Sequence, residues 1–276
     1  MADGMASGAY VLGHDDHELD RLASQARIID PATRWFFSEA GIAPGMRVLD
    51  IGSGAGDVAL LAASLVGPSG QVVGTDRSAA ALARARERAN AREFSNVSFV
   101  EGDPSSLTFE RPFDAMVGRW VLMYQPDPGA FLRKLMAHVR PGGVIVFHES
   151  DLANARSSPR VSTFETWCAI VAEVMLREGY HTNGQQMLVR AFRDAGLPIP
   201  KMRSHAVTAG GGAGATDEVR LLTDLVRTLR DEIVRHGLAA AADLEDDVPA
   251  ERILAEMAAT GAVITYRADV AAWCQA

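Results

Sequence analysis

The feature that most constrains the fold of this chain is a short apolar segment that runs into three closely spaced glycines. Residues 48–51 are Val-Leu-Asp-Ile, and Gly52, Gly54 and Gly56 follow at alternate positions. An apolar run, a glycine-rich turn and the apolar stretch 58–66 together predict a buried strand that turns directly into a helix. Glycines at such a turn let the backbone approach a ligand and expose N–H groups at the start of the helix. The segment therefore predicts an α/β fold with a ligand-binding turn.

Short apolar, β-branched runs alternate with alanine-rich helical stretches as far as residue 148, as expected for parallel strands buried between helices. Right-handed connections then predict a doubly wound, mostly parallel sheet of seven strands. The predicted strands are 47–51, 71–75, 97–100, 113–117, 143–148, 202–208 and 262–267. The predicted helices are 58–66, 79–92, 129–138, 163–177, 184–195, 217–236 and 250–259.

The segments on either side of this alternating region differ from it in kind. Pro31 interrupts the helical pattern near the N-terminus, which predicts two short helices outside the sheet, and a glycine-rich stretch at 209–215 predicts a mobile turn. We expect an N-terminal helical lid at 1–45, a core at 46–208, a helical cap insertion at 209–260 and the last strand of the core at 261–276.

Composition and charge exclude several classes of protein. The 276 residues are 48% hydrophobic and 22% charged, which is typical of soluble globular proteins. No apolar run approaches the roughly 20 residues of a membrane span and the N-terminus lacks a secretory leader, so we expect a cytoplasmic protein without a membrane partner. The net charge of -8 argues against nucleic acid as a partner, because phosphate binding needs a basic face. Cys168 and Cys274 have no Cys or His at ligand spacing, so we expect no metal site.

The spacing of the glycines separates two classes of nucleotide-binding turn. A dinucleotide-binding turn would place its third glycine at position 57, which is Asp57, and it has no fixed need of an acidic residue at Asp50. The run LDIGSGAG at 49–56 instead resembles the first motif of the class I S-adenosylmethionine-dependent methyltransferases, which have a Rossmann-like fold. Four later segments resemble further motifs of this family in the same order, namely residues 75–77, 101–104, 113–120 and 140–143. The resemblance therefore covers about residues 40–150.

This resemblance implies S-adenosylmethionine as the cofactor, S-adenosylhomocysteine as its product and no metal. The carboxylate of Asp76 would receive both ribose hydroxyls, Asp103 would accept the adenine amino group, and Arg119 would border the methionine moiety. The implied cofactor residues of the core are Asp50, Gly52, Ser53, Gly54, Gly56, Asp76, Arg77, Gly102, Asp103, Pro104 and Arg119. Structural alternatives are a tight strand-to-helix turn for the glycines, a helix cap for Asp76, a turn starter for Asp103 and strand-end packing for Arg119.

The N-terminal residues resemble the leader of bacterial small-molecule methyltransferases, including those of actinobacterial natural-product pathways. The resemblance implies that Tyr10, Arg21 and Gln25 close over the cofactor, with Tyr10 also reaching the acceptor. The alternative is a plain amphipathic helix with solvated charges. Trp35 and the two phenylalanines after it are expected to be exposed on this helix, where they would allow a homo-oligomer.

Residues after the fourth and fifth strands are candidates for the acceptor side, because ligands in such folds lie at the carboxyl ends of the strands. His148 titrates in the right range for a general base, and Glu149 follows it. Trp120 and Tyr124 would form an apolar wall and a cation–π contact with a sulfonium. The alternatives are a hydrogen-bonded strand-end histidine and ordinary core aromatics.

The sequence thus predicts methyl transfer to a small, largely hydrophobic organic acceptor. Transfer from a sulfonium is an in-line displacement that depends on alignment and on excluding water. Hydroxyl O-methylation in secondary metabolism is the first hypothesis. Carbon methylation of a prenyl or terpenoid double bond, N-methylation, and a cofactor-binding protein that transfers no methyl group are the alternatives.

Overall fold

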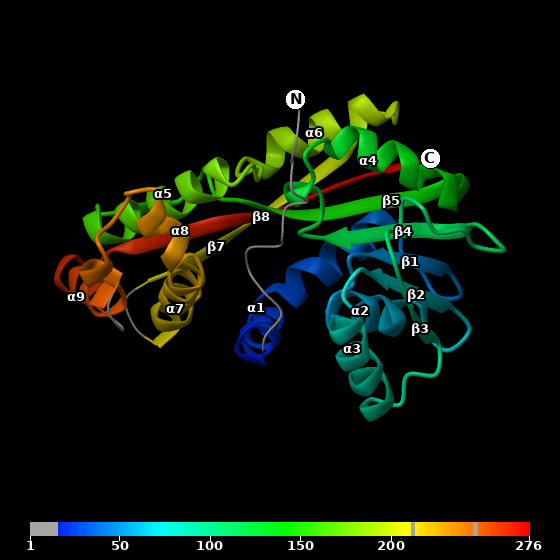
Figure 1. The fold of residues 1–276 in the computed structure, drawn as a ribbon, viewed down its shortest axis with the longest axis horizontal. Helices are drawn as coiled ribbons and strands as arrows, with labels where there is room; N and C mark the ends of the chain where they lie inside the picture. The colour runs from blue at the N-terminus through cyan, green and yellow to red at the C-terminus, as the bar shows by residue number, and fades with distance from the viewer. Residues whose placement is uncertain (1–15, 211–212, 245–247) are drawn as a thin grey trace, which may run out of the picture.

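The computed structural model describes residues 16–210, 213–244 and 248–276 of the chain. These residues form one central sheet with the strand order β3-β2-β1-β4-β5-β8-β6, and β7 also pairs with β8 (Figure 1). The strands are β1 Arg47–Ile51, β2 Gln71–Asp76, β3 Val97–Glu101, β4 Phe113–Arg119, β5 Val139–Asp151, β6 Arg156–Ser158, β7 Lys201–Ala209 and β8 Val263–Gln275.

Strands β1 to β5 are parallel to one another, and β8 runs antiparallel to its neighbours β5, β6 and β7. The prediction of a mostly parallel α/β sheet is confirmed. Three details differ: the short strand β6 was not predicted, β5 spans Val139–Asp151 and not only 143–148, and β8 continues to Gln275 although the sequence predicted its end at Arg267. Pairing with both β5 and β7 extends β8, because its backbone finds partners on two sides.

Helices cover both faces of the sheet. They are α1 Asp16–Ala40, α2 Asp57–Val66, α3 Ala79–Ala91, α4 Pro128–Leu135, α5 Ser162–Arg177, α6 Gly184–Ala195, α7 Ala213–Thr228, α8 Arg230–Arg235 and α9 Val248–Thr260, with short 3-10 turns at η1 Leu122–Tyr124, η2 Met136–His138 and η3 Ala241–Leu244. Val48 packs in an apolar cluster with α1, α2 and α3, whereas Leu49 packs in a second cluster with α4, α5 and α6. Successive strand residues therefore supply two cores on opposite faces.

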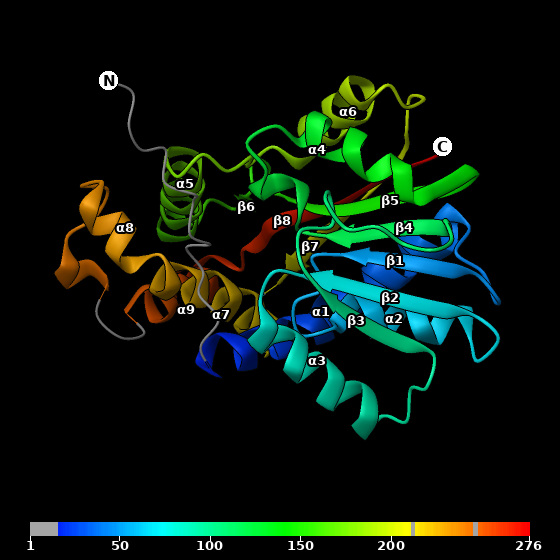
Figure 2. The same ribbon diagram turned by 45° about the vertical axis from the view of Figure 1, so that its right-hand side comes forward.

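A second group of helices lies beyond one end of the sheet. Helix α5 contacts α7, α8 and α9, and β8 extends into this group (Figures 1 and 2). The arrowheads of β2 and β4 point toward the same side in Figure 2, so the carboxyl ends of the parallel strands face these helices. This arrangement encloses the edge of the sheet where ligands bind in α/β folds.

The N-terminal helix corrects one prediction. Helix α1 is a single helix of 25 residues that continues through Pro31, whereas the sequence predicted a break there. Ile29, Phe36 and Phe37, on either side of the proline, are fully buried, and Pro31 itself is exposed. Burial of these side chains compensates for the hydrogen bond that proline removes.

Two further segments differ from the predicted boundaries. Residues 213–215 of the predicted turn belong to helix α7, and the predicted helix at 217–236 is two helices that meet at Leu229. No helix in the described ranges is long and apolar enough to cross a membrane.

Candidate functional site

The glycine-rich loop joins β1 to α2 and is tied to the end of β2. The Ser53 N–H donates to the carbonyl oxygen of Thr75 at 2.8 Å, and the Gly56 N–H donates to the carbonyl oxygen of Ser53 at 2.8 Å. Gly52, Gly54 and Gly56 have φ values of 65°, 50° and 87°, in the left-handed region that favours glycine. The loop therefore takes a shape that other residue types would adopt only with strain.

The surroundings of the three glycines show which side of the loop is open. A Cβ atom on Gly52 would lie 2.9 Å from Cγ2 of Val121, and one on Gly56 would lie 3.0 Å from Cβ of Ala85. A Cβ on Gly54 would meet nothing within 4 Å. Gly52 and Gly56 are thus required by packing, whereas Gly54 faces open space at the carboxyl edge of the sheet.

This difference predicts unequal effects of adding one methyl group. Gly52→Ala should lower the free energy of unfolding by about 2–4 kcal/mol, because alanine would strain the left-handed backbone and its Cβ would overpack against Val121. Gly54→Ala should cost only about 1–2 kcal/mol, from the left-handed backbone alone. Urea unfolding of both variants measures the two values. Equal losses would contradict the assigned packing role of Gly52.

Asp76, the last residue of β2, stands beside this loop with a half-buried carboxylate. Oδ2 accepts the Gly54 N–H at 2.9 Å, and Oδ1 accepts the Ser78 N–H at 2.8 Å. Ser78 itself caps α3 by accepting the Ala81 N–H at 3.2 Å. A carboxylate offers about four lone-pair positions, so Asp76 keeps the capacity to accept two further hydrogen bonds.

The residues after β3 are tied to the end of β2. The Gly102 N–H donates to the carbonyl oxygen of Asp76 at 2.9 Å, and Arg77 pairs with Asp103 at 2.5 Å. Asp103 also accepts the Ser105 N–H at 2.9 Å, so it starts the turn that follows β3. Burial acts to raise the pKa of Asp103, but the hydrogen bonds from Ser105 and Arg77 hold this pKa below its ordinary value. Asp103 is therefore ionised and already engaged by the protein on both oxygens.

Pro104 is buried, and its carbonyl oxygen accepts a hydrogen bond from Nε2 of His138 at 2.7 Å. Beneath the glycine loop, Asp50 and Ser53 carry buried side-chain oxygens with no hydrogen-bond partner in the part of the chain that is described. Burial raises the pKa of Asp50 well above its ordinary value, although the charge of Arg119 acts to lower it. These unpartnered oxygens mark the base of the loop as a place where a ligand or water completes the hydrogen bonding.

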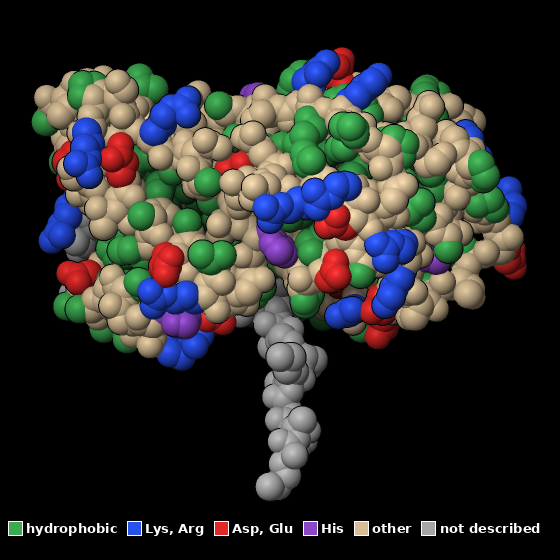
Figure 3. Space-filling view, turned by 90° about the horizontal axis from the view of Figure 1, so that it is seen from above, with side chains coloured by type: hydrophobic (Ala, Val, Ile, Leu, Met, Phe, Trp, Pro, Cys, Tyr) green, Lys and Arg blue, Asp and Glu red, His purple; other side chains and the backbone are tan. Residues whose placement is uncertain are grey.

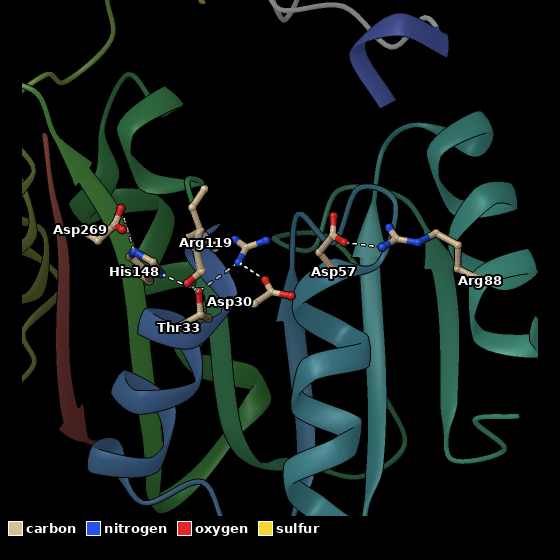
Figure 4. Close-up of polar contacts among 8 residues, drawn as sticks. Asp30, Thr33, Asp57, Arg88, Arg119, His148 and Asp269 are labelled. Atoms are coloured by element: carbon tan, nitrogen blue, oxygen red, sulfur yellow. Dashed lines mark hydrogen bonds and ion pairs between the residues drawn. The ribbon is translucent and has the colours of Figure 1, made fainter. Parts of the chain in front are cut away.

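Arg119 connects the end of β4 to helix α1 (Figure 4). Its Nη1 donates to Oδ1 of Asp30 at 2.8 Å and to Oγ1 of Thr33 at 3.0 Å, and its side chain is 7% exposed. The sequence predicted Arg119 but gave no sign of these partners. The ion pair and hydrogen bond fix α1 across the carboxyl ends of the central strands.

His148 lies between α1 and β8 (Figure 4). Its Nδ1 is 3.0 Å from Oγ1 of Thr33, and its Nε2 is 3.4 Å from Oδ1 of Asp269. The ring is fully buried, and burial lowers the pKa of His148 even though Asp269 acts to raise it. His148 is therefore neutral near pH 7, with both ring nitrogens directed at protein groups.

Glu149 is fully buried below the segment that follows β4. Its carboxylate accepts the backbone N–H groups of Val121 at 3.1 Å, Leu122 at 2.8 Å and Met123 at 3.4 Å. Burial raises the pKa of Glu149 to about 7, and the three hydrogen bonds act in the opposite direction. All the polar contacts described for this carboxylate are with backbone N–H groups, which it holds in place. None of these contacts depends on a bound methyl acceptor.

The two predicted aromatic residues lie on this same segment. Trp120 has a positive φ of 55°, and its backbone N–H donates to the carbonyl oxygen of His148 at 2.9 Å. The ring of Tyr124 packs edge-on against Tyr180 with centroids 5.0 Å apart. Both predicted aromatics are half-buried against the core, so the structure brings them to the end of β4 and leaves part of each accessible.

Sequence reasoning missed the residues that α1 and β8 contribute. Asp30 and Thr33 carried no motif, and Arg267 and Asp269 stand in what reads as an ordinary apolar strand. The charges of Arg267 and Asp269 inside an otherwise apolar strand are the one available sign, because ionised side chains are rarely buried unless they are paired.

The structure tests only part of the N-terminal predictions. Tyr10 lies outside the described residues, and Arg21 and Gln25 belong to α1 but their side chains are not described. Phe36 and Phe37 are fully buried within the chain, so the expected exposed aromatic surface is wrong for these two. Trp35 alone of the three is exposed, at 41%.

The chain is similar to known methyltransferases. Residues 42–196 match a family model described as a methyltransferase domain. The chain is 31% identical to an arsenite methyltransferase of Halobacterium salinarum over 56% of this chain and 39% of that protein. It is 41% identical to a 2-phytyl-1,4-naphtoquinone methyltransferase of Synechococcus elongatus over 36% of this chain and 43% of that protein. A demethylmenaquinone methyltransferase of Staphylococcus aureus is 26% identical over 60% of this chain and 73% of that protein.

The chain spans about two fifths of the length of the first two relatives. The solved structure of a putative methyltransferase from Bacillus halodurans C-125 shares the fold, with a TM-score of 0.58, 16% identity and coverage of 87% of this chain and 96% of that one. The matched family model spans the glycine loop, both acidic strand ends and His148. The chain therefore belongs to the methyltransferase domain family, which confirms its resemblance to the class I S-adenosylmethionine-dependent methyltransferases.

Proposed function

We propose that this chain transfers a methyl group from S-adenosylmethionine to a hydroxyl group of a small, largely hydrophobic organic acceptor, as in secondary metabolism. The observation that carries the proposal is the open face of the glycine loop at Gly54 beside the free acceptor capacity of Asp76. The cofactor, when bound, supplies an electrophilic methyl group on a sulfonium.

The residues at the strand ends fit such a cofactor. Asp76 would accept the two ribose hydroxyls, because it retains lone pairs and is fixed by two backbone N–H groups. Asp103 and Arg77 hold the ends of β2 and β3 together, where the adenine would lie. The unpartnered oxygens of Asp50 and Ser53 lie beneath the loop, where the methionine moiety would complete their hydrogen bonding.

The cysteines of the chain favour an organic acceptor over a soft metalloid ion. Soft ions select thiolate ligands, and the chain has two cysteines, one in α5 and one near the end of β8. Burial raises the pKa of Cys168, and it also raises the pKa of Cys274 to about 11, so both remain protonated thiols near pH 7. The relative named for arsenite therefore gives less guidance on the acceptor than the relatives named for quinones.

Surface charge also favours a small molecule over nucleic acid. On the face drawn in Figure 3, Lys and Arg side chains are interspersed with Asp and Glu side chains. A nucleic-acid site would need a band of basic residues along the phosphate backbone. The helices that face the strand ends instead pack around a buried apolar cluster, which accords with a small hydrophobic acceptor.

Carbon methylation of a prenyl double bond is the second candidate, and the setting of His148 favours it. The imidazole is fully buried, with Nδ1 3.0 Å from Oγ1 of Thr33 and Nε2 3.4 Å from Oδ1 of Asp269 but without a hydrogen bond, so neither nitrogen is exposed to an acceptor hydroxyl. A double bond attacks the methyl group first and loses its proton afterwards, and this order requires no base during the transfer.

Calorimetric titration of the purified protein with S-adenosylhomocysteine, beside NAD as a control, tests the cofactor class. Micromolar binding of the first and none of the second is expected. Acceptors are then screened by the mass gain of one methyl group, and NMR of the product separates O-methylation from C-methylation. Absence of S-adenosylhomocysteine binding would refute the proposed function.

Asp76→Asn should weaken S-adenosylhomocysteine binding by about 1–3 kcal/mol. The amide NH₂ group of asparagine is a donor, and it replaces a carboxylate oxygen that accepts a hydrogen bond from the ligand or from the loop. Asp114→Asn is the matched control: its half-buried carboxylate also accepts a backbone N–H, that of Arg47 at 2.8 Å, but it lies at the opposite edge of the sheet. The control should bind as wild type does. Unchanged affinity of Asp76→Asn would remove its ribose role.

A further inference from the structure

Two buried N–H donors without partners belong to neighbouring side chains, Trp120 just after β4 and Arg267 in the first half of β8. Arg267 is 4% exposed, and its Nε donates to Oδ1 of Asp269 at 3.2 Å. Its Nη2 has no hydrogen-bond partner in the described part of the chain, and neither has the buried indole Nε1 of Trp120. Cζ of Arg267 lies 5.6 Å from the centroid of the Trp120 ring. Leaving two buried donors unsatisfied destabilises the fold, so these donors call for an explanation by a ligand.

The backbone at this place is also unusual. Trp120 adopts a φ of 55°, which a bulky residue rarely does, and its own N–H is held by the carbonyl oxygen of His148. Strained backbone of this kind persists where the surrounding structure enforces it, and it gathers at functional sites. The strain fixes the indole at the end of β4, next to the guanidinium.

Arg267 stands apart from the cofactor residues, whereas Trp120 follows Arg119 directly and precedes Val121, whose side chain lies next to Gly52. The glycine loop, Asp76 and Asp103 stand at the ends of β1, β2 and β3, whereas Arg267 is on β8, and β4 and β5 lie between β1 and β8. Before Arg267, β8 begins at Val263, directly after α9 and beside the helical group that includes α7. Arg267 therefore lies on the acceptor side of the sheet, and Trp120, just after β4, stands between it and the glycine loop.

The charges around the pair indicate the chemistry of the group that would bind. Asp269 offsets the charge of Arg267, and Glu218 of α7 is close enough to act on the same guanidinium, with its own Oε2 buried and unpartnered. Two N–H donors from different side chains suit a single oxygen with two lone pairs. A ring that carries this oxygen would also stack near the indole.

We propose that Trp120 Nε1 and Arg267 Nη2 together bind a carbonyl or carboxylate oxygen of the methyl acceptor, which makes the acceptor an oxygen-substituted planar compound. This proposal rests on the proposed function and specifies its substrate class. The same two donors would also suit the carboxylate of the cofactor, so the test has to separate the two sources.

The test uses the full chain with ¹⁵N in its four tryptophan side chains, which give four indole N–H resonances. Trp120→Phe removes one resonance and so assigns it. Benzoate and acetophenone are the oxygen-bearing probes, and benzylamine is the control without an acceptor oxygen. We expect benzoate or acetophenone to move the Trp120 indole proton downfield by more than the other three, and benzylamine to leave it in place.

The cofactor arm compares S-adenosylhomocysteine with 5′-methylthioadenosine, which lacks the carboxylate. Equal positions of the Trp120 resonance in both complexes support the acceptor assignment. A downfield shift with S-adenosylhomocysteine alone would assign the donors to the cofactor and overturn the proposal. No shift with benzoate or acetophenone would overturn it as well. The probe arms are run without cofactor, so a failure of S-adenosylhomocysteine to bind refutes the proposed function separately.

Arg267→Lys provides a second variant that keeps a positive partner for Asp269. Lysine replaces the forked guanidinium with a single ammonium, so benzoate affinity, measured by the same shift, should fall by roughly tenfold. Affinity for S-adenosylhomocysteine should stay as in wild type. Unchanged benzoate affinity in this variant would contradict a role for the guanidinium in binding the oxygen.

Discussion

Replacing Asp269 by Asn is expected to lower the free energy of unfolding by about 3–5 kcal/mol, because it leaves the buried charge of Arg267 without its partner. Asp269 is 1% exposed and Arg267 is 4% exposed, so solvent does not replace the lost carboxylate. Oδ1 of Asp269 also lies 3.4 Å from Nε2 of His148, and the substitution removes this contact too. Urea unfolding at pH 7 measures the loss.

The pH dependence of the same variant gives an independent check. Burial acts to raise the pKa of Asp269, but the nearby charge of Arg267 and the His148 ring hold this pKa below its ordinary value. A carboxyl group with a lowered pKa in the folded state stabilises the protein above the unfolded-state pKa of about 3.9, and this contribution is lost as the pH falls below it. The stability difference between wild type and Asp269→Asn should therefore be full at neutral pH and shrink below about pH 4.

An exposed ion pair supplies the control for this prediction. Glu39 and Arg203 are 42% and 49% exposed and lie 3.4 Å apart. Glu39→Gln should change stability by less than about 1 kcal/mol, since solvent screens such a pair. If Asp269→Asn lost no more stability than Glu39→Gln, the prediction that the buried Arg267–Asp269 pair stabilises the fold would be wrong.

The elements that the sequence predicted well are those whose pattern is local. The strand at 47–51 has the observed bounds of β1, and the helix at 184–195 has those of α6, because apolar runs and flanking turn residues define both ends. The glycine loop was predicted for the same reason, since three left-handed positions need glycine within a few residues of one another.

The parts that escaped prediction depend on partners distant in the sequence. The path of α1 through Pro31 is fixed by burial of Phe36 and Phe37 against the sheet and α2, which no local pattern reveals. Distant strands also place the charged pair of β8: antiparallel pairing sets Asp269 opposite Ser150 of β5, more than a hundred residues earlier, and Arg267 opposite Val207 of β7. Cofactor candidates were therefore easier to name than the groups on the acceptor side.

The contacts of Glu149 could not be predicted from its position along the chain. Glu149 follows the predicted base directly, and the sequence placed it at the acceptor. Its carboxylate accepts three backbone N–H groups from the segment after β4, including that of Leu122 at 2.8 Å. Side chains of adjacent strand residues point to opposite faces, so Glu149 and His148 face opposite sides of β5.

Changing His148 to Gln tests the general base directly: turnover of a hydroxyl acceptor falls by about 10²–10⁴-fold if the buried His148–Asp269 pair removes the proton, and it stays unchanged if the imidazole only holds α1 and β8 together. Affinity for S-adenosylhomocysteine should stay as in wild type, because the ring contacts Thr33 and Asp269 and none of the loop residues. Burial lowers the pKa of His148, so the neutral base persists to a lower pH than for an ordinary histidine. Turnover by wild type should accordingly fall only below about pH 6.5.

His236→Gln is the matched control, since His236 lies on the helical group and pairs with Glu178 at 2.6 Å, away from the strand ends. Turnover of this control should equal that of wild type. Unaffected turnover in His148→Gln as well would remove His148 as the base and favour carbon methylation, in which the attacking double bond needs no deprotonation before transfer. An acceptor without a transferable proton gains nothing from a base. A loss of turnover confined to hydroxyl acceptors would therefore establish that the buried His148–Asp269 pair takes part in proton removal.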